Sequence, residues 1–550
     1  MKICFYFIFM ELIILTFAGY VYAQAPVMEW LRTFDGPVSS FDQIKFIRLD
    51  AQQNVVVTGE VQTGAGATYR DIVTRKYDPD GNLLWSHTWN NSDYNLDDIV
   101  YDMEIAPNGY VIVVGVSRIL ATSNTNSIAI IYALDENGNY LWMDSLQGTG
   151  HVNIVNGNPI PIHSNYLFDL DVHTNGDIYV CGYITGNNVS EYERMFVAKY
   201  SASGVRQWFN HFDNSTAFEY SDMGFSMAID GAGNVYVCGL TTLVTTWRDF
   251  VVWKIDTAGN FLHVATRPGA LNSVSEQLEE IISDQNGNVY TYGINASGRF
   301  TVIKYDSALV KLWEYEFDTI IVGNTGSFTG ADASLALDNA GNLIFAANMN
   351  IKMGVAKFSP NGNLLWLNFY GGTGTGNSHS YHVVTDTYNN IYVTGSYSNA
   401  GSSFFDVGVF KLDPNGNQLF SLTYDGANNQ NDKGHSIAVS DSGYIYVGGF
   451  TTGATNGDYL LIKYAHDNTP TAVQAINSPL NVLIYPNPAE EQFIIQSEDD
   501  GVFELMDIHG KILQTYETRD NKSVIQVLWP AGFYLLRERQ SGAVLKLLVE

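Results

Sequence analysis

Cysteine is nearly absent from this chain of 550 residues, which contains only three. Cys4 lies within the first 23 residues, so only Cys181 and Cys238 remain beyond them. Two cysteines provide neither a disulfide scaffold nor a cysteine-based zinc site, and both classes of stabilisation are excluded. Cys181 and Cys238 occupy the same position in adjacent repeats. We expect them to be buried thiols that pack as small apolar side chains.

Positive charge is also scarce, because 28 Lys and Arg residues face 57 Asp and Glu residues, giving a formal net charge of −29. Binding to nucleic acid requires clustered Lys and Arg that neutralise phosphates, and the sequence has no such run. We therefore expect no nucleic-acid partner. The acidic residues are spread along the chain, which favours solubility rather than a particular fold.

Long hydrophobic runs are missing after the first 23 residues, where no segment reaches the roughly 20 apolar residues that a membrane-spanning helix needs. The first 23 residues differ in character. Lys2 is followed by an apolar stretch, and residues 21–23 (Val-Tyr-Ala) fit a signal-peptide cleavage site. We predict a secretory signal peptide over residues 1–23 and no transmembrane segment after its removal.

What the chain has in quantity is one repeated phrase. Its clearest copy, residues 230–239, reads Asp-Gly-Ala-Gly-Asn-Val-Tyr-Val-Cys-Gly, and successive copies end 48 to 67 residues apart. A period of about 55 residues indicates a repeat architecture. The eight copies end at Gly59, Gly115, Gly182, Gly239, Gly293, Ala347, Gly395 and Gly449.

Each repeat contains four short apolar runs separated by Asp, Asn and Gly, which predicts four antiparallel strands. Four-stranded sheets repeated around an axis are the blades of a β-propeller. The eighth repeat stops before its fourth strand, whereas residues 28–34 precede the first repeat and resemble that strand. We therefore predict an all-β protein with an eight-bladed propeller over residues 24–467, closed by the N-terminal strand. Seven blades is the fallback if one repeat does not form.

The fourth strand of most repeats carries a tryptophan, and His263 or Phe420 takes this place in two of them. A large flat side chain on the outermost strand can pack across the interface to the next blade. The tryptophans expected to dock neighbouring blades are Trp30, Trp85, Trp142, Trp208, Trp313 and Trp366.

The connections differ between the two faces of the predicted propeller. The Asp-x-x-Gly-Asn turns are short and uniform, and we expect φ above zero at Gly81, Gly233 and Gly416. The loops of the opposite face vary in length and are long around the second and third repeats, so we expect them to form the binding face. The aromatic residues near this face that could stack on sugars are Tyr94, Tyr166, Tyr192 and Trp247.

A different pattern follows the repeats. Residues 468–479 are a polar linker that contains proline, and residues 480–550 contain short alternating apolar runs that predict a small β-sandwich. The module has a Tyr-Pro-Asn-Pro start, an Asp followed by Gly-Lys, a Pro-Ala-Gly-x-Tyr-x-Leu segment and a Lys-Leu-Leu-Val stretch. The residues of these motifs that we select are Tyr485, Pro486, Asn487, Pro488, Gly510, Lys511, Gly532, Tyr534 and Lys546.

In this order the motifs resemble the type A C-terminal sorting domain of the Bacteroidetes type IX secretion system. The resemblance implies export across the inner membrane by the signal peptide and across the outer membrane by the type IX machinery, which would be a partner. It also implies that the sorting domain is cut off and that the protein is released or attached to the cell surface. Glu550 departs from the basic ending of many members. The repeats resemble bacterial β-propeller repeats that often accompany such domains.

No residue pattern predicts a catalytic, cofactor or metal site. The adjacent carboxylates Asp97-Asp98 and Glu279-Glu280 point to opposite sides of a strand and are not expected to converge, and the histidines are scattered. The Asp-rich turns lack the glutamate that ends a calcium loop, and Asp and Asn bond to turn backbones without metal. Residues 133–142 resemble the tryptophan-docking motif of quinoprotein dehydrogenases. The spacing differs by one residue, however, and no adjacent cysteine pair is present, so we expect no cofactor.

These observations favour a secreted or cell-surface propeller that serves as a non-catalytic binding or adhesion module, with a polysaccharide or a surface protein as partner. Two alternatives stay open. One is a secreted glycan-active enzyme with its site on the variable-loop face, and the other is a surface structural scaffold. A carboxylate pair about 5–10 Å apart on that face would favour the enzyme. An aromatic-lined groove would favour binding, and a flat polar face would favour the scaffold.

Overall fold

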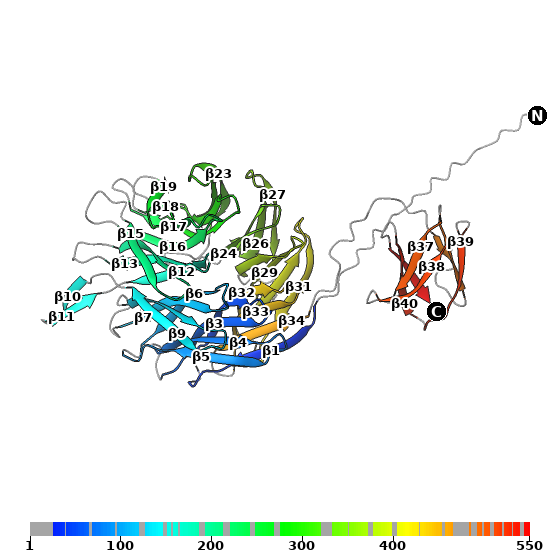
Figure 1. Cartoon of the computed structure of the whole chain (residues 1–550), viewed down its shortest axis with the longest axis horizontal. Helices are drawn as coiled ribbons and strands as arrows, with labels where there is room; N and C mark the ends of the chain where they lie inside the picture. The colour runs from blue at the N-terminus through cyan, green and yellow to red at the C-terminus, as the bar shows by residue number, and fades with distance from the viewer. Residues whose placement is uncertain are drawn as a thin grey trace, which may run out of the picture. The chain divides into compact units, whose positions relative to one another are not determined.

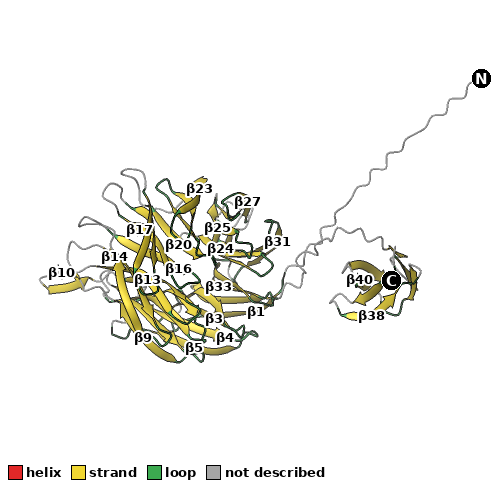
Figure 2. Cartoon of the chain, turned by 45° about the horizontal axis from the view of Figure 1, so that its top comes forward, coloured by secondary structure: helices red, strands yellow, loops and turns green. Residues whose placement is uncertain are grey.

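The computed structural model describes two compact units, which correspond to residues 26–465 and 483–549 (Figure 1). All regular elements of the described residues are β-strands (Figure 2). Among these residues, no helix has the length and hydrophobicity needed to cross a membrane. Within the two ranges the description leaves out residues 39, 65–68, 94–95, 120–126, 147–150, 156–157, 163–164, 186–192, 213–220, 243–247, 269–275, 321–332, 350, 372–377, 399–403, 428, 454–456, 486–491, 498–499, 507–510, 520–521, 531 and 540–543.

The first unit contains eight four-stranded antiparallel sheets, which we number blades 1 to 8 in chain order. Blades 1 to 4 are β2 (Gln43–Leu49), β3 (Val55–Gln62), β4 (Arg70–Tyr77) and β5 (Leu83–Trp89); β6 (Asp98–Ile105), β7 (Val111–Arg118), β8 (Ser127–Leu134) and β9 (Tyr140–Leu146); β12 (Tyr166–Val172), β13 (Ile178–Thr185), β14 (Glu193–Tyr200) and β15 (Arg206–Phe212); and β16 (Asp222–Ile229), β17 (Val235–Thr241), β18 (Asp249–Ile255) and β19 (Phe261–Arg267). A hairpin, β10 (His151–Val155) and β11 (Asn158–Ile162), lies between blades 2 and 3 in the sequence.

The second half of the ring follows the same plan. Blades 5 to 8 are β20 (Gln277–Ser283), β21 (Val289–Ile294), β22 (Arg299–Tyr305) and β23 (Lys311–Ile320); β24 (Ala333–Leu337), β25 (Leu343–Met349), β26 (Lys352–Phe358) and β27 (Leu364–Tyr370); β28 (His379–Thr385), β29 (Ile391–Ser398), β30 (Phe405–Leu412) and β31 (Gln418–Tyr424); and β32 (Lys433–Val439), β33 (Ile445–Thr452), β34 (Gly457–Tyr464) and β1 (Met28–Phe34). The first strands of neighbouring blades pack against one another, which makes them the inner wall of the ring.

Blade 8 is completed by the N-terminal strand, as the sequence predicts. β1 pairs antiparallel with β34, with Leu31 opposite Ile462 and Phe34 opposite Tyr459, and the two strands lie side by side in Figure 1. The pairing satisfies the backbone of β34 and removes the free edge that the ring would otherwise expose. The predicted all-β fold, an eight-bladed propeller closed by an N-terminal strand, is confirmed.

The burial of the middle strands explains why the repeated segment is apolar at successive positions. Every residue of β3 and of β8 is buried, because these strands are covered by neighbouring blades on both faces. Strands covered on both sides lose the alternation of apolar and polar residues that a half-exposed strand shows. Cys181 in β13 and Cys238 in β17 lie in such strands and are buried free thiols, as predicted.

The turn chemistry also follows the sequence prediction. Gly81, Gly233 and Gly416 have φ of 80°, 83° and 82°, in the left-handed region that glycine enters without strain. In the turn after β4, Asp78 Oδ1 accepts hydrogen bonds from the backbone of Asp80 and Asn82 at 3.0 and 2.8 Å. The turn carboxylates are therefore used by their own backbone, which accounts for the Asp-x-x-Gly-Asn pattern.

The outermost strands contact the next blade through the six tryptophans. Five of their indole N–H groups donate to a backbone carbonyl in a turn of the following blade, at 2.9–3.2 Å. The ring of Trp366 also covers Gly416, where a Cβ would come within 2.8 Å of it. Trp142 covers Gly204 in the same way, but its buried N–H has no partner among the described residues. The donor–acceptor pairs are Trp30–Pro79, Trp85–Glu136, Trp208–Thr257, Trp313–Pro360 and Trp366–Pro414.

The third strands carry seven buried lysines, and five of them donate to a backbone carbonyl of the following blade. In four joints a lysine and a tryptophan share one carbonyl. At blade 6, for example, Lys357 Nζ donates to Pro414 O at 3.0 Å while it pairs with Asp338 at 2.9 Å. Buried charges need such partners to offset desolvation. The seven lysines are Lys76, Lys199, Lys254, Lys304, Lys357, Lys411 and Lys463.

The second unit is a two-sheet β-structure with its own core. Phe493, Ile495, Phe503, Leu505 and Leu536 are buried together with apolar residues of the last strand. The sheets are β35 (Leu483–Tyr485), β36 (Gln492–Gln496) and β39 (Lys522–Gln526); and β38 (Ile512–Glu517), β37 (Val502–Met506), β40 (Gly532–Glu538) and β41 (Val544–Val549).

The closing strand gives a first prediction. Deleting residues 25–34 removes β1, so β34 becomes an exposed edge strand. We expect the melting temperature of the propeller to fall by several degrees or more and the protein to self-associate. Differential scanning calorimetry and light scattering measure both effects. Deletion of ten residues from the linker at 468–479 is the control, and an unchanged monomer after loss of β1 would contradict the closure.

The tryptophans give a second prediction. Trp366→Phe removes an N–H that donates to Pro414 O at 3.2 Å, whereas Trp142→Phe removes a buried N–H without a partner among the described residues. Because both changes shrink the ring equally, we expect Trp366→Phe to cost about 1 kcal/mol more in unfolding free energy. Denaturant titration of the two variants measures this difference. Equal costs would show that the indole hydrogen bond contributes nothing.

Candidate functional site

The inner wall of the propeller encloses a cavity of about 580 Å³. Residues of all eight first strands line it, namely β2, β6, β12, β16, β20, β24, β28 and β32. A cavity of this size matches the range of small-ligand sites in proteins. We call this cavity the channel.

A β-bulge sets which side chains face the channel. In seven of the eight first strands the pairing register shifts by one residue at the same place, for example between Val100 and Asp102 in β6 and between Leu167 and Asp169 in β12. A bulge redirects the side chains that follow it. The residue after the bulge, with its equivalent in β24, forms a set that we call the channel ring: Phe46, Asp102, Asp169, Ser226, Glu280, Ser334, His382 and Ser436.

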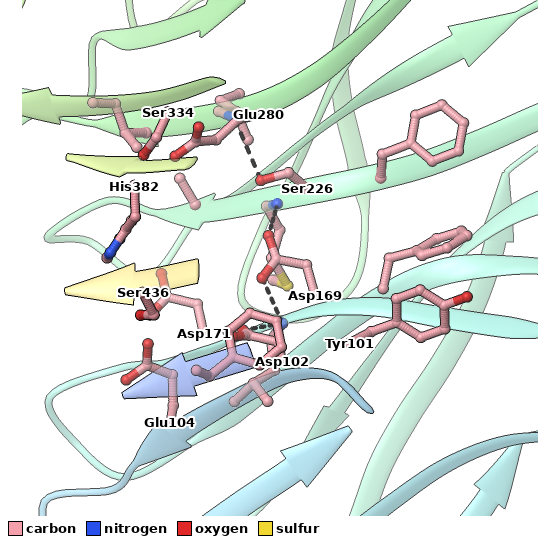
Figure 3. Close-up of a pocket in the computed structure, with 18 of the residues that line it drawn as sticks. Tyr101, Asp102, Glu104, Asp169, Asp171, Ser226, Glu280, Ser334, His382 and Ser436 are labelled. Carbon is pink, nitrogen blue, oxygen red and sulfur yellow. Dashed lines mark hydrogen bonds between the residues drawn. The ribbon is translucent and has the colours of Figure 1, made fainter. Parts of the chain in front are cut away.

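The ring side chains join neighbouring blades by hydrogen bonds to backbone N–H groups. Asp169 Oδ2 accepts from Met227 N at 2.7 Å, and Glu280 Oε2 accepts from Leu335 N at 3.1 Å. Asp102, Ser226 and His382 make the corresponding bonds to blades 3, 5 and 8. Figure 3 shows these side chains converging from separate strands. The bonds orient the polar groups of the channel before any ligand arrives.

Only some of the charged groups in the channel have an oppositely charged partner. Arg48 lies 2.5 Å from Glu104 and 3.5 Å from Asp102, so these three groups form an ion-pair cluster. Lys45 pairs with Glu60 at 2.6 Å. In the described part of the chain, no ion pair joins the remaining channel carboxylates to Lys or Arg. These carboxylates are Asp169, Asp171 and Glu280.

Burial and the lack of counter-charge raise the pKa of all three groups. Burial raises the pKa of Glu280 to about 8 and, with the neighbouring charge of Glu104, that of Asp171 to about 6. The pKa of Asp169 lies well above its ordinary value because of burial and the charge of Asp102. Burial lowers the pKa of His382 to about 4 with help from the Arg48 charge, so this histidine is neutral at pH 7.

Aromatic side chains form a second layer beside the ring. The bulged residues Tyr101, Phe168 and Phe225 come from blades 2, 3 and 4, with ring centroids 4.9 and 5.5 Å apart. All three line the channel, and Figure 3 shows Tyr101 to one side of the carboxylates. The ammonium of Lys45 lies 5.9 Å from the Tyr101 ring, within cation–π distance.

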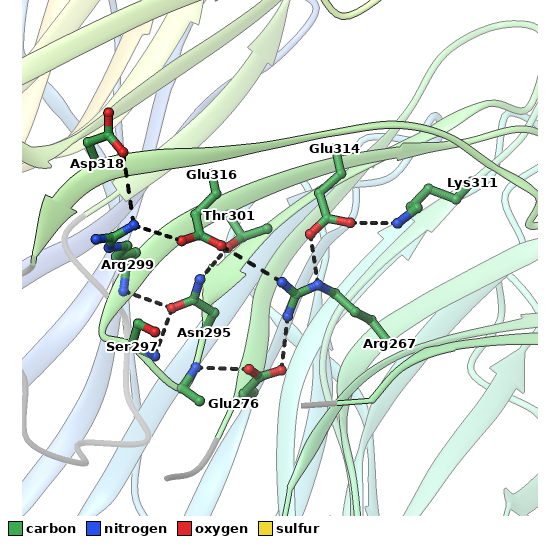
Figure 4. A network of polar contacts seen from close by, with 11 residues as sticks. Arg267, Glu276, Asn295, Ser297, Arg299, Thr301, Lys311, Glu314, Glu316 and Asp318 are labelled. Carbon is green, nitrogen blue, oxygen red and sulfur yellow. Dashed lines mark hydrogen bonds and ion pairs between the residues drawn. The ribbon is translucent and has the colours of Figure 1, made fainter. Parts of the chain in front are cut away.

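Two other polar clusters lie away from the channel. Figure 4 shows Arg267 at the end of β19 bonded to Glu314 at 2.8 Å and to Glu276 at 3.1 Å, which links blades 4 and 5. Asp406, Asp425 and Asp432 bring carboxylate oxygens within 4.8 Å of one another, the arrangement of a possible cation site. Asp432 there already accepts backbone hydrogen bonds from two residues of blades 7 and 8. Both clusters serve the joints between blades.

The residues selected from the sequence lie elsewhere. The six tryptophans are on outermost strands, away from the inner wall. Of the four aromatic residues expected near the binding face, Tyr166 packs against Phe168 and Tyr183. The other three, Tyr94, Tyr192 and Trp247, lie outside the described residues, as do most of the long variable loops.

The sorting-motif residues are described in part. Tyr485 lies in β35, Gly532 and Tyr534 in β40, and Lys546 in β41, while Lys511 directly precedes β38. Tyr534 Oη donates to Pro530 O at 2.8 Å, which ties the turn to its strand. The motif residues outside the described part are Pro486, Asn487, Pro488 and Gly510.

Sequence reasoning missed the channel carboxylates because it compared neighbours within one strand. Asp97-Asp98 and Glu279-Glu280 were the pairs considered, whereas the structure gathers single residues from different blades, such as Asp169 and Glu280. His382 and His435 likewise reach the channel from adjacent blades. A usable signal was present: the first strands of blades 2 and 3 alternate acidic and apolar residues over Asp102–Glu104 and 169–171.

Comparison with known proteins identifies the second unit. Residues 483–550 match the family described as the secretion system C-terminal sorting domain. The chain is a secreted β-propeller protein with a sorting domain. This domain engages the type IX secretion machinery and directs the protein to the cell surface or outer membrane, where the tail is cleaved. No curated protein matches the sequence.

Solved structures resemble the propeller. Sqt1 of Saccharomyces cerevisiae is 8% identical with a TM-score of 0.49, and the match covers 80% of this chain and 99% of Sqt1. The WD40 domain of SCAP from fission yeast is 11% identical with a TM-score of 0.40, covering 80% and 98%. Prolyl oligopeptidase B from Galerina marginata is 11% identical with a TM-score of 0.39, covering 75% and 55%. At such identities the likeness concerns the fold alone.

The raised pKa of Glu280 gives a third prediction. The folded protein keeps this carboxyl protonated up to a pH of about 8, whereas the unfolded chain releases the proton near 4.5. The stabilising contribution of the proton is complete below 4.5 and is lost as the pH rises to about 8. Relative to Glu280→Gln, the unmodified protein should therefore become less stable between pH 5 and pH 9.

Melting temperatures of both proteins at pH 5, 7 and 9, in a buffer free of amines, measure this difference. The amide oxygen introduced by Glu280→Gln can still accept the hydrogen bond from Leu335 N, so the variant isolates the charge. Glu316→Gln, on the outermost strand of the same blade, is the control and should show no such pH-dependent difference. If the melting temperatures of Glu280→Gln and the unmodified protein differ by the same amount at every pH, the raised pKa of Glu280 is contradicted.

Proposed function

We propose that this secreted propeller is a non-catalytic binding module whose ligand site is the channel. The observation that carries the proposal is an open, polar cavity of about 580 Å³ with walls from all eight blades. Its side chains are held on strands rather than on loops, which gives a site of fixed geometry. The sorting domain places such a module at the cell surface, where it can meet ligands from outside the cell.

The contacts in the channel support binding rather than turnover. The carboxylates Asp102, Asp169 and Glu280 already accept backbone hydrogen bonds, and His382 Nδ1 accepts one from Ile437 N at 3.2 Å. Among the described residues no serine of the channel is hydrogen-bonded to a histidine, as a nucleophile and its base would be. The groups are oriented, but none is paired for proton transfer to a nucleophile.

A cavity-filling variant tests the proposal. Ser334→Phe places a large side chain on the channel ring, and Ser334 gives up no hydrogen bond in the described structure. We expect saturable binding of one ligand per chain by the unmodified mature protein and loss of this binding in the variant. Calorimetry and thermal-shift measurements against soluble oligosaccharides, amino acids, amines and dicarboxylates reveal the ligand, and mass spectrometry shows whether it is recovered unchanged.

Ser86→Phe, on the exposed outermost strand β5, is the matched control and should bind like the unmodified protein. Ser436→Phe fills the channel from blade 8 and replaces Ser334→Phe if the latter does not fold. Chemical conversion of the ligand would replace the proposal by an enzyme. Binding that survives both channel variants would place the ligand on the variable loops instead.

A further inference from the structure

The channel contains more half-buried carboxyl groups than its own cations pair with. Arg48 is committed to Glu104 and Asp102, and Lys45 is committed to Glu60. Asp169, Asp171 and Glu280 accept hydrogen bonds from Met227 N at 2.7 Å, Ile229 N at 3.1 Å and Leu335 N at 3.1 Å, respectively. Asp169 also lies beside the carboxyl of Asp102, and among the described residues none of the three forms an ion pair with Lys or Arg. A carboxyl group that is partly shielded from water and lacks a counter-charge is costly to ionise, and a cation that enters the site lowers that cost.

Two serines of the channel ring are also without partners in the described part of the chain. Ser334 and Ser436 are 4% and 3% exposed and line the same cavity, and Figure 3 shows both hydroxyl groups among the carboxylates and His382. Neither side chain makes a hydrogen bond within the described residues. A buried hydroxyl is normally satisfied by the protein, by water or by a ligand. These oxygens can accept hydrogen bonds from the N–H groups of a cation.

The aromatic residues beside the channel ring favour an organic cation over a metal ion. Tyr101, Phe168 and Phe225 add aromatic and apolar surface to the same channel. Aromatic faces attract ammonium and guanidinium groups, and they also pack against the methylene groups that carry them. A bare metal ion would use only the oxygens and would gain nothing from this layer.

The positions of the carboxylates argue against a metal ion as well. A metal site requires several ligand atoms close to one centre. Within the described residues the only such group of three is Asp406, Asp425 and Asp432, outside the channel. The channel carboxylates come from blades 2, 3 and 5 and are spread around the wall. They therefore suit a ligand that is several atoms long rather than a single ion.

We infer that the channel binds a small organic cation that carries ammonium or guanidinium groups, paired with Asp169 and Asp171 on blade 3 or with Glu280 on blade 5, and an alkyl stem against Tyr101, Phe168 and Phe225. The inference rests on the proposed function, because it names the class of ligand for the same site. The cation is either a free amine or the side chain of a basic peptide, since both present the same group.

Three probes of equal length isolate the charge. The mature full-length protein is titrated calorimetrically with 1,5-diaminopentane, 1,5-pentanediol and glutarate in amine-free buffer. We expect saturable binding of the diamine and binding at least about tenfold weaker for the diol and the dianion. Calcium chloride tests the metal alternative and should not compete. A tripeptide with a central lysine shows whether a side chain can replace the free amine.

Two isosteric variants test the named carboxylates. Glu280→Gln and Asp169→Asn keep an oxygen for the hydrogen bonds from Leu335 N and Met227 N while they remove the charge. We expect each to weaken diamine binding by about tenfold or more, because a buried charge pair is lost, with a melting temperature equal to or above that of the unmodified protein. Glu316→Gln, an outer carboxylate of blade 5, is the matched control and should bind the diamine normally.

The outcomes separate this inference from the proposed function. If Ser334→Phe abolishes binding of a neutral or anionic ligand while neither amine binds, the channel is a binding site, but the inference that its ligand is a cation is wrong. Equal diamine affinity in Glu280→Gln, Asp169→Asn and the unmodified protein also overturns the inference. If no ligand depends on the channel at all, both proposals fail together.

Discussion

Ring closure is the constraint on which the rest of this structure depends. The pairing of β1 with β34 joins the first described strand of the chain to the last strand of the propeller and leaves no blade with three strands. It also fixes the number of blades at eight. The number of blades sets the width of the inner wall, and β1 completes the eighth blade although no residue of β1 lines the channel.

The shortage of positive charge has a consequence inside the molecule. Seven lysines are buried in the third strands, and in four joints a lysine and a tryptophan of the same blade share a backbone carbonyl of the next blade. Arg48 and Lys45 are paired as well. With only 28 Lys and Arg against 57 acidic residues, carboxylates such as Asp169 and Glu280 stay without a counter-ion among the described residues. The acidity is therefore more than a surface property, although the sequence suggested solubility alone.

The two units of this secreted protein have separate tasks. The sorting domain has its own core around Phe493, Phe503 and Leu536 and can be cleaved without opening the propeller. The propeller holds its blades together by packing and hydrogen bonds, with Cys181 and Cys238 as free thiols. Because its channel side chains are fixed by bonds between blades, the site keeps its shape without a disulfide.

The sequence by itself determined the architecture and the destination. The repeated phrase, the missing fourth strand of the last repeat and the tryptophan at residue 30 were sufficient for a closed eight-bladed propeller, and the motif from Tyr485 to Lys546 was sufficient for the sorting domain. These signals are local: turn glycines, apolar runs and short motifs act within a few residues, so they can be read directly from the chain.

Only the tertiary structure decided where the polar groups meet. Asp102, Asp169, Glu280, His382 and their ring neighbours are separated by about 55 residues from one blade to the next, and the sequence alone does not show which of them face one another. A one-residue bulge in the first strands turns them to the same wall, and the bulge leaves no residue type by which it could be recognised. The lysines at the joints were overlooked for the same reason. Their carbonyl partners lie one blade away, and only closure of the ring brings the two together.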